Sequence, residues 1–418
     1  MVKEIQAGDY VEIFTPKTSY EGILLESPEN EILLLKLKQG YNIGFNKKDI
    51  LKVKFLKRIK QEKNSFEIKN NSEKPNIAVL ICGGTITSRL DPKTGGVAHL
   101  TSPEELFRFY PEIFDKVNVL KTEVLFTKDS SEIEPKDWQK FAKSCKKYLE
   151  DDNIKGIIIT HGTDTLHYTS SALSFFLGKI SKPVVLTYSQ RSTDRASSDA
   201  NLNLKCASLV AISDIAEVVV VGHASSSDDF CYAIRGTKVR KMHSSKRDAF
   251  KPINSEPIAK IYEDKIEILS DYNSRKKEKI KLDNCFEKKV ALIKYYPGQD
   301  SEILDYYLKN KYKGIILEML GLGQISRKWI KKLKEIQKKG IVVCVTTQTI
   351  YGRVNSLVYY IGRELIKTGI IYLEDIHSET AFVKLGWVLG RKKWNFSKEK
   401  IKEKMLENFA GEFSKRLG

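Results

Sequence analysis

Four short polar segments of the chain carry residue types that can perform acyl-transfer chemistry. They are Gly83-Gly84-Thr85-Ile86, Asp129-Ser130-Ser131, His161-Gly162-Thr163-Asp164-Thr165 and the run from Arg235 to Ser245. A threonine hydroxyl is a weak nucleophile at neutral pH and needs a base to take its proton. A lysine can be that base if burial disfavours its charge, and an adjacent carboxylate fixes its position. Two consecutive glycines let backbone N–H groups approach a developing oxyanion.

The stretch IIITHGTDTL, from Ile157 to Leu166, has two interpretations. Its apolar β-branched run predicts a buried strand, and the residues after it predict a turn into a helix. Thr163 and Asp164 therefore lie at the carboxyl end of a strand, where parallel α/β sheets bind ligands. The same two residue types also cap helix N-termini, and from this stretch alone the cap is the commoner role. The other three segments favour the catalytic interpretation, and one residue can do both.

Strands and helices alternate around these segments. Apolar runs that predict strands lie at Ile77 to Ile81, Glu123 to Phe126, Ile154 to Thr160, Val184 to Tyr188 and Val218 to Val221. Trp138, Phe141, Ala142, Cys145 and Leu149 recur at helical spacing over Pro135 to Leu149, with the proline at a plausible first helical position. This order predicts a parallel sheet with helices on both faces, whose strand ends converge on one crevice.

The domain organisation follows from shifts in composition. Residues 1–60 contain short alternating segments and turn formers, which predict a small β-barrel-like module. A polar linker, 61–75, precedes a large α/β domain at 76–270 that carries the four segments. A charged linker at 271–288 leads to a smaller C-terminal α/β domain at 289–418. The expected fold class is therefore α/β, with a small β-module in front.

Composition excludes some classes of protein and leaves others open. No apolar run approaches the roughly 20 residues of a membrane span, and the N-terminus has no apolar signal core, so we expect a cytoplasmic protein. The six cysteines contain no C-x-x-C pair, and no metal site is expected. The net charge of +18 permits a polyanionic partner, but solvated lysine-rich helix faces explain it equally well. We expect His161, His167, His223 and His243 to be packing or supporting residues.

GGTI, the DSS segment, HGTDT and V-x-K-x-H-S-S, in this order, resemble the L-asparaginase/glutaminase family. The resemblance runs from Asn76 to the C-terminus and implies the two-domain asparaginase fold. It makes Thr85 the usual primary nucleophile and Thr163, Asp164 and Lys241 the supporting triad. Lys238 competes for the lysine role, although the V-x-K register favours Lys241, and either threonine could attack first.

The same resemblance implies a substrate-binding set at the predicted crevice. Ser130 matches the serine that holds the α-carboxylate of the substrate, and Asp164 would also meet its α-ammonium. Ser131, Gly84 and Gly162 complete the predicted binding residues. The family also implies a homodimer, with each active site finished by a residue of the neighbouring subunit.

One difference from the asparaginases and two additional segments indicate which branch of the family the chain resembles. The loop from Ser88 to Thr101 lacks the tyrosine of free-standing bacterial asparaginases. The N-terminal module and the segment from Tyr188 to Ala200 instead resemble the family of D subunits of archaeal Glu-tRNA(Gln) amidotransferases. That family implies a glutaminase whose ammonia passes to an E subunit, which activates Glu-tRNA(Gln) with ATP.

The implied partners follow from this second resemblance. They are L-glutamine, the E subunit, and Glu-tRNA(Gln) bound mainly through that subunit, in a heterotetramer built on a homodimer. The chain contains no G-x-x-x-x-G-K-[ST] phosphate loop, in agreement with ATP and Mg²⁺ belonging to the partner and no cofactor to this chain. Arg191, Asp194 and Arg195 form either a solvated loop or a surface for the partner or tRNA.

Two alternative functions remain open from the sequence. The first is a free-standing cytoplasmic L-asparaginase, which would hydrolyse asparagine rapidly without a partner. The second is a non-enzymatic tRNA-binding or scaffold protein, which would bind tRNA tightly and in a salt-dependent way without amidase activity.

Overall fold

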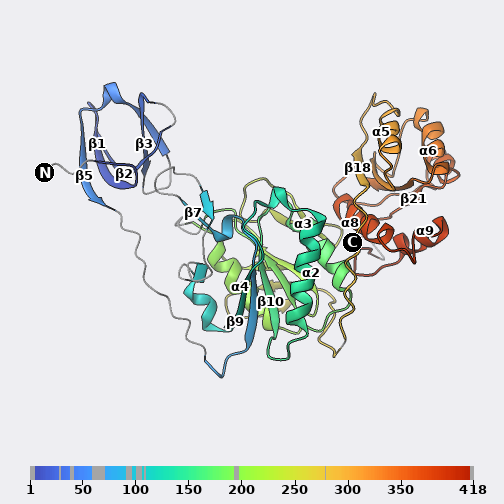
Figure 1. The fold of residues 1–418 in the computed structure, drawn as a ribbon, viewed down its shortest axis with the longest axis horizontal. Helices are drawn as coiled ribbons and strands as arrows, with labels where there is room; N and C mark the ends of the chain where they lie inside the picture. Colours follow the sequence, from blue (N-terminus) through green and yellow to red (C-terminus); the bar gives the residue numbers. More distant parts are fainter. Residues whose placement is uncertain are drawn as a thin grey trace.

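The computed structural model describes most of the chain, namely residues 5–27, 30–37, 42–58, 71–90, 97–99, 106–107, 110–192, 197–277 and 279–414. These residues form a small β-module, a large α/β unit and a smaller C-terminal α/β unit (Figure 1). Most of the first predicted linker, the loop from Asp91 to Gly96, and the pair Asp194 and Arg195 lie outside the described residues.

The N-terminal residues form a small β-module, as predicted, and its five strands make an antiparallel sheet with the order β4-β3-β2-β1-β5. Its strands are β1 (Asp9–Phe14), β2 (Ser19–Leu25), β3 (Ile32–Leu37), β4 (Asn42–Asn46) and β5 (Lys52–Arg58). Val11, Ile13 and Leu35 are completely buried and form its core. The sequence does not predict β4, because asparagine and glycine are depleted in strands. It forms because Ile43 pairs with Leu35 and the Phe45 ring packs 5.0 Å from that of Tyr20.

An eight-stranded sheet is the centre of the large unit, with the order β17-β16-β13-β12-β11-β10-β6-β9. Its strands are β6 (Asn76–Ile81), β9 (Asn118–Val124), β10 (Gly156–Thr160), β11 (Val184–Thr187), β12 (Val218–His223), β13 (Cys231–Arg235), β16 (Ala259–Ile261) and β17 (Ile266–Ile268). The five strands from β9 to β12 are parallel, as predicted. β13, β16 and β17 extend the sheet antiparallel. The sequence misses β16 and β17 because each has three residues within a charged stretch.

Two short ribbons flank this sheet. They are β7 (Ser88–Leu90) with β8 (Val97–His99), and β14 (Val239–Lys241) with β15 (Phe250–Pro252). The 3₁₀ turns among the described residues are η1 (Lys47–Asp49), η2 (Thr85–Thr87), η3 (Pro111–Asp115) and η4 (Ser130–Glu132).

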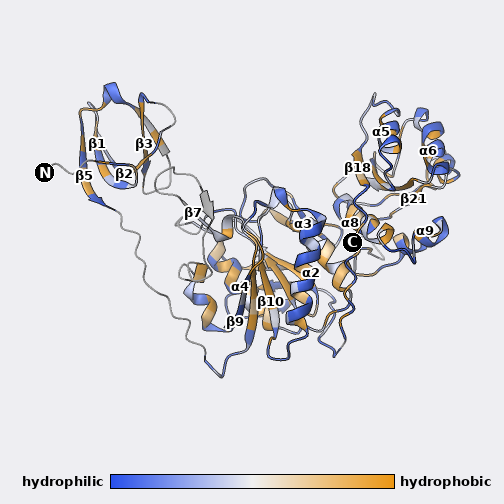
Figure 2. Ribbon diagram, viewed as in Figure 1, coloured by the Kyte–Doolittle hydropathy of each residue, from blue (hydrophilic) through white to orange (hydrophobic). Residues whose placement is uncertain are grey.

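Helices cover both faces of the large sheet. They are α2 (Pro135–Leu149), α3 (Leu166–Leu177) and α4 (Ala200–Ile212). The predicted α2 begins at Pro135, where Glu134 and Asp137 form a reciprocal capping box. Residues of α2 and α3 line one buried cluster and those of α4 another, which places α4 on the opposite face. Figure 2 shows the apolar residues concentrated in the strands and on the helix faces turned toward them.

The C-terminal unit has a four-stranded parallel sheet in sequence order. Its elements are β18 (Val290–Lys294), α5 (Ile303–Lys309), β19 (Gly314–Met319), α6 (Lys328–Lys338), β20 (Val342–Thr347), α7 (Tyr360–Ile366), β21 (Ile371–Tyr372), α8 (Ser378–Leu389) and α9 (Lys398–Leu406). Every residue of α8 except Phe382 is buried. Burial all round a helix requires a partner on each side. These partners are its own sheet and α3 of the large unit.

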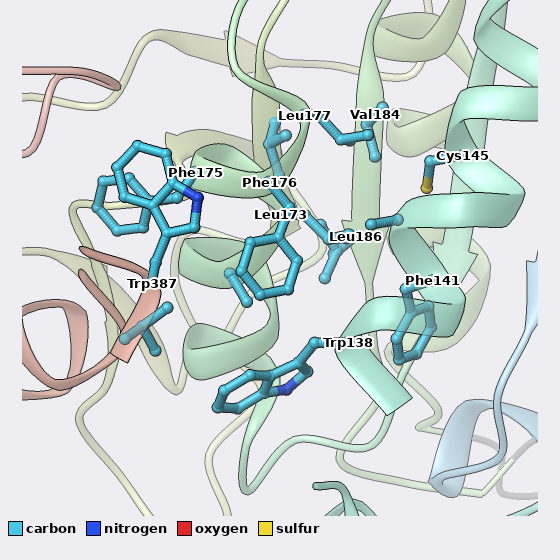
Figure 3. Packing of buried hydrophobic residues seen from close by; sticks show 14 of the residues in the cluster. Trp138, Phe141, Cys145, Leu173, Phe175, Phe176, Leu177, Val184, Leu186 and Trp387 are labelled. Carbon is cyan, nitrogen blue, oxygen red and sulfur yellow. The ribbon is translucent and has the colours of Figure 1, made fainter. Parts of the chain in front are cut away.

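One continuous hydrophobic cluster joins the large and C-terminal units. The Trp387 ring of α8 stacks on that of Phe175 in α3, with ring centroids 5.3 Å apart (Figure 3). Trp394 and Phe409 pack edge-on against the same indole, which also donates a hydrogen bond to the carbonyl of Asp283. Within the described ranges, no helix is long and apolar enough to cross a bilayer.

Replacing Trp387 with alanine should destabilise both units together. Loss of a buried tryptophan costs about 3–5 kcal/mol of unfolding free energy. The cluster spans the junction between the two units. The denaturant midpoints measured by tryptophan fluorescence and by circular dichroism should therefore fall by the same amount. Tyr306→Ala, at an exposed aromatic of α5, is the control and should leave the midpoint nearly unchanged. A shift confined to one of two separate transitions would contradict this account.

Candidate active site

The order of the parallel strands determines where the site lies. In chain order the five strands β6, β9, β10, β11 and β12 are arranged as 2-1-3-4-5, so the chain direction across the sheet reverses between β6 and β10. Ligands of open α/β sheets bind at the carboxyl ends of the strands beside such a reversal. Ile81 of β6 pairs with both Thr160 of β10 and Val124 of β9. The loops after these three strands therefore leave the sheet at one place.

Close backbone contacts hold these loops together. Gly84 has a φ of +82°, and a Cβ on it would lie 2.4 Å from the Cα of Gly162. A Cβ on Gly162 would lie 2.8 Å from the Oγ of Ser130. A side chain at either glycine would separate the loops. Glycine is therefore required at both positions for GGTI, HGTDT and the serine segment to meet.

Ser130, in the loop after β9, fixes the HGTDT loop after β10, with β6 lying between these two strands in the sheet. Its buried hydroxyl accepts a hydrogen bond from the backbone N–H of Asp164 at 3.0 Å. The Thr165 hydroxyl donates to the Ser130 carbonyl at 2.6 Å. The Ser130 hydroxyl keeps its own proton, with which it can donate to an anionic group. Ser131 is exposed beside it.

Lys241 reaches the HGTDT loop from the β14–β15 ribbon. Its Nζ donates to the Thr163 Oγ1 and to an Asp164 carboxylate oxygen, each at 2.7 Å. The lysine side chain is 12% exposed and that of Asp164 is 66% exposed. The ammonium is thus shielded, while the carboxylate faces solvent. This arrangement provides a hydroxyl whose proton can be exchanged with a lysine beside an exposed carboxylate.

The structure separates the two candidate lysines. The Nζ of Lys238 donates to Asp375 at 2.7 Å, and both side chains are buried in the junction with the C-terminal unit. Burial lowers the pKa of Lys238. Of the two lysines it is Lys241 that contacts Thr163.

Thr85 follows the two left-handed glycines and is the first residue of η2, where it is partly exposed. The hydroxyls of Thr87 and Ser88 donate to the Gly84 carbonyl at 3.1 and 2.8 Å, which stabilises this turn. The structure thus brings Gly84, Gly162 and Ser130 together and joins Thr163, Asp164 and Lys241 by hydrogen bonds. The loop after GGTI, where the family has its closing tyrosine, is outside the described residues at 91–96.

Of the four histidines considered above, His161, His167 and His223 are buried and His243 is exposed. His161 is buried against the Phe141 ring, and its Nε2 is 2.9 Å from the Thr169 hydroxyl. Burial lowers the pKa of His161 to about 4 and that of His167 to about 3. His223 lies between Asn203 and Asp228, and the Nδ1 of His243 accepts two backbone N–H groups. Among the described residues, no group of His, Cys, Asp and Glu could hold a metal ion.

Sequence reasoning missed the C-terminal acids that hold the β14 segment. Asp375 pairs with Lys238 and Glu379 pairs with Arg240. The only sequence signal is the spacing of the basic residues. In a strand, Lys238 and Arg240 would lie on one face and Lys241 on the other. That alternation does not indicate which distant segment would pair with them.

Comparison with known families defines the class of protein. The asparaginase N-terminal family model matches residues 76–273, and the glutaminase/asparaginase C-terminal domain matches residues 289–405. The thermostable L-asparaginase of Thermococcus kodakarensis superposes with a TM-score of 0.73 at 31% identity, covering 82% of this chain and all of that one. L-asparaginase I of Vibrio cholerae has a TM-score of 0.70 at 27% identity, covering 82% of this chain and 99% of that one. The chain therefore has the asparaginase fold.

The N-terminal module and the full-length relatives identify the family more closely. The GatD N-terminal domain model matches residues 5–56. The D subunit of the glutamyl-tRNA(Gln) amidotransferase of Pyrococcus furiosus is 45% identical, over 99% of this chain and 96% of its own length. The protein of the same name from Methanococcus maripaludis is 42% identical over 98% of both. The chain belongs to the family of glutamyl-tRNA(Gln) amidotransferase D subunits, and its enzyme class is that of an amidotransferase.

Acidification should destabilise the protein through its buried histidines. His161 has a pKa of about 4 in the folded chain and an ordinary pKa of 6.5 when unfolded. Between these values the unfolded chain binds more protons, so folding stability falls as the pH drops from 6.5 to 4. By linkage, this one group accounts for about 3 kcal/mol of that loss.

The measurement is a series of urea titrations between pH 4 and 7. His161→Gln should show a shallower fall than the wild type across this window. His243→Gln, at an exposed histidine, should keep the wild-type slope. Equal slopes for His161→Gln and the wild type would refute this assignment.

Proposed function

We propose that this chain is the glutaminase subunit of a tRNA-dependent amidotransferase and hydrolyses L-glutamine to glutamate and ammonia. A partner E subunit uses the ammonia, with ATP and Mg²⁺ of its own, to convert Glu-tRNA(Gln) to Gln-tRNA(Gln). The observation that carries the proposal is the contact of the Lys241 Nζ with Thr163 and Asp164 at the end of β10. Membership of the D-subunit family supports glutamine as the amide donor.

The reaction we propose is acyl transfer to a threonine. The hydroxyl of Thr85 or Thr163 attacks the amide carbon of glutamine, and Lys241, in its neutral form, accepts the proton through Thr163. The tetrahedral oxyanion is held by backbone N–H groups near Gly84. As the intermediate collapses, Lys241 returns its proton to the leaving nitrogen and ammonia departs. Water then hydrolyses the acyl-enzyme to glutamate and the free threonine. The short Lys241–Thr163 contact favours Thr163 as the first nucleophile, whereas the resemblance to asparaginases favours Thr85.

The substrate would be oriented by groups at the same strand ends. The Ser130 hydroxyl, with its free proton, suits the α-carboxylate of glutamine, and the exposed Asp164 carboxylate suits the α-ammonium. Ser131, Gly84 and Gly162 border that position. We propose that these chains form a homodimer within a heterotetramer containing two E subunits, and that tRNA is bound mainly through the E subunit.

Thr163→Ala and Lys241→Ala should each abolish glutamine hydrolysis while leaving the fold intact. Each change removes one end of the proton relay, and general base catalysis contributes about 10²–10⁴-fold. Ammonia release, with circular dichroism as the check on folding, is the measurement. Lys246→Ala removes an exposed lysine of the loop between β14 and β15 and should retain wild-type turnover. Near-wild-type rates in either site variant would rule out the mechanism.

The order of the two threonines can be decided by trapping the intermediate. Acid quenching during turnover, followed by peptide mass spectrometry, should show a glutamyl adduct on one threonine. The same measurement in Thr85→Ala and Thr163→Ala shows which threonine accepts the glutamyl group and which passes the proton to Lys241.

Adding the E subunit and tRNA(Gln) should raise glutaminase activity and couple it to formation of Gln-tRNA(Gln). The assay compares ammonia release by the chain alone, with the E subunit, and with both partners. High asparaginase activity of the chain alone, unaffected by the partners, would instead indicate a free-standing asparaginase. Tight, salt-dependent tRNA binding without any amidase activity would indicate a binding protein.

A further inference from the structure

The strand that carries Lys241 is too small to hold that residue by itself. In the part of the chain that the structure describes, β14 has three residues and pairs only with β15, which also has three. An isolated two-stranded ribbon is marginally stable at best. Lysine also has a long side chain with many rotamers. The two 2.7 Å contacts of Lys241 therefore need a support outside the ribbon.

The alternation of side chains along the strand directs Arg240, the residue before Lys241, to the opposite face. Successive side chains of a strand point to opposite faces. Lys241 faces Thr163 and Asp164, whereas Arg240 faces α8, where its guanidinium is 2.8 Å from a Glu379 carboxylate oxygen. Lys238, two residues before Arg240, pairs with Asp375 of the C-terminal unit. The C-terminal unit thus holds alternate residues and leaves Lys241 to the site.

Glu379 is itself fixed and ionised. Its side chain is 9% exposed, and the Nδ1 of His377 is 3.1 Å from its second carboxylate oxygen. Burial works to raise the pKa of Glu379, but His377 and Arg240 together lower it well below its usual range. A buried carboxylate with defined partners cannot move without leaving a charge unpaired, which is costly.

The backbone before β14 is held as well. The Ser170 hydroxyl of α3 donates to the Gly236 carbonyl at 2.7 Å. The Thr380 hydroxyl of α8 donates to the Thr237 carbonyl at 3.1 Å. Ser171 and Thr380 are in turn joined at 2.8 Å. The first turn of α8 therefore holds both the backbone and the Arg240 side chain of the segment that carries the catalytic lysine.

We infer that Glu379, acting through Arg240, is a positioning residue for Lys241. This inference rests on the function proposed above, and it adds that the C-terminal unit of the same chain sets the geometry of the proton relay. Glu379 does not touch the reacting atoms. It fixes the strand so that one lysine reaches both Thr163 and Asp164.

Glu379→Gln in the full chain, assayed with the partner subunit, tests this inference. Misplacement of a catalytic group by about 1 Å can cost up to about 10²-fold, so kcat should fall roughly 10- to 100-fold with a smaller change in KM. The pH profile of kcat should shift, because the environment of the lysine changes. Glu379→Asp, which keeps the charge, should recover part of the loss.

A matched control separates positioning from stability. Glu412 pairs with Lys384 at 2.7 Å, and both are completely buried in the same C-terminal unit. Glu412→Gln therefore also removes a buried carboxylate that pairs with a lysine. It should lower the melting temperature to a similar extent while keeping the wild-type kcat and pH profile at temperatures where both variants are folded.

A second readout does not depend on glutaminase activity. Competitive acetylation followed by mass spectrometry gives the reactivity of Lys241 relative to the exposed Lys246. It should rise several-fold in Glu379→Gln and stay unchanged in Glu412→Gln. If the wild type fails to hydrolyse glutamine, the proposed function fails, but the acetylation ratio still decides the positioning role. Unchanged Lys241 reactivity in Glu379→Gln, or an equal effect of Glu412→Gln, would overturn the inference.

Discussion

The backbone contact between the loops that follow β6 and β10 is the constraint on which the rest of the site depends. Gly84 and Gly162 approach so closely that neither tolerates a Cβ, and Ser130 packs against the second of them. The reversal in strand order brings these loops to one edge, and the absence of side chains lets them touch. Once they touch, Ser130 can hold the N–H of Asp164, and Thr163 lies within reach of Lys241.

The site also depends on the junction between the two α/β units. α8 is buried between its own sheet and α3, and Trp387 extends the core of the large unit into the C-terminal one. Buried ion pairs lie at this junction, including Lys238–Asp375 and Arg240–Glu379. Replacing such a pair with apolar residues is often neutral or stabilising, but separating its partners leaves a buried charge unpaired and is costly, so the pair resists rearrangement. A defined geometry is what a proton relay over hydrogen-bond distances requires.

Much of this architecture could be predicted from the sequence, for identifiable reasons. The strands before GGTI and HGTDT are continuous apolar runs, and the helix at Pro135 carries a periodic apolar face with a cap. The short strands β4, β16 and β17 could not be predicted, because pairing partners rather than composition make them strands. Lys238 and Lys241 are equivalent in type and differ only in what faces them. The pairing of Arg240 with Glu379 joins residues far apart in the chain, and no local pattern encodes it.

The order in which the chain is made gives the C-terminal segment a particular importance. Domains fold as they emerge during synthesis, from the N-terminus onward. The backbone N–H of Ser414 donates to Asp375, the partner of Lys238, so this late residue completes the contacts that hold the segment before β14. A growing or prematurely terminated chain would carry every motif of the active site without this support. In the mechanism proposed above, completion of the polypeptide is therefore the event that organises the proton relay, and a fragment ending before α8 would have no active relay.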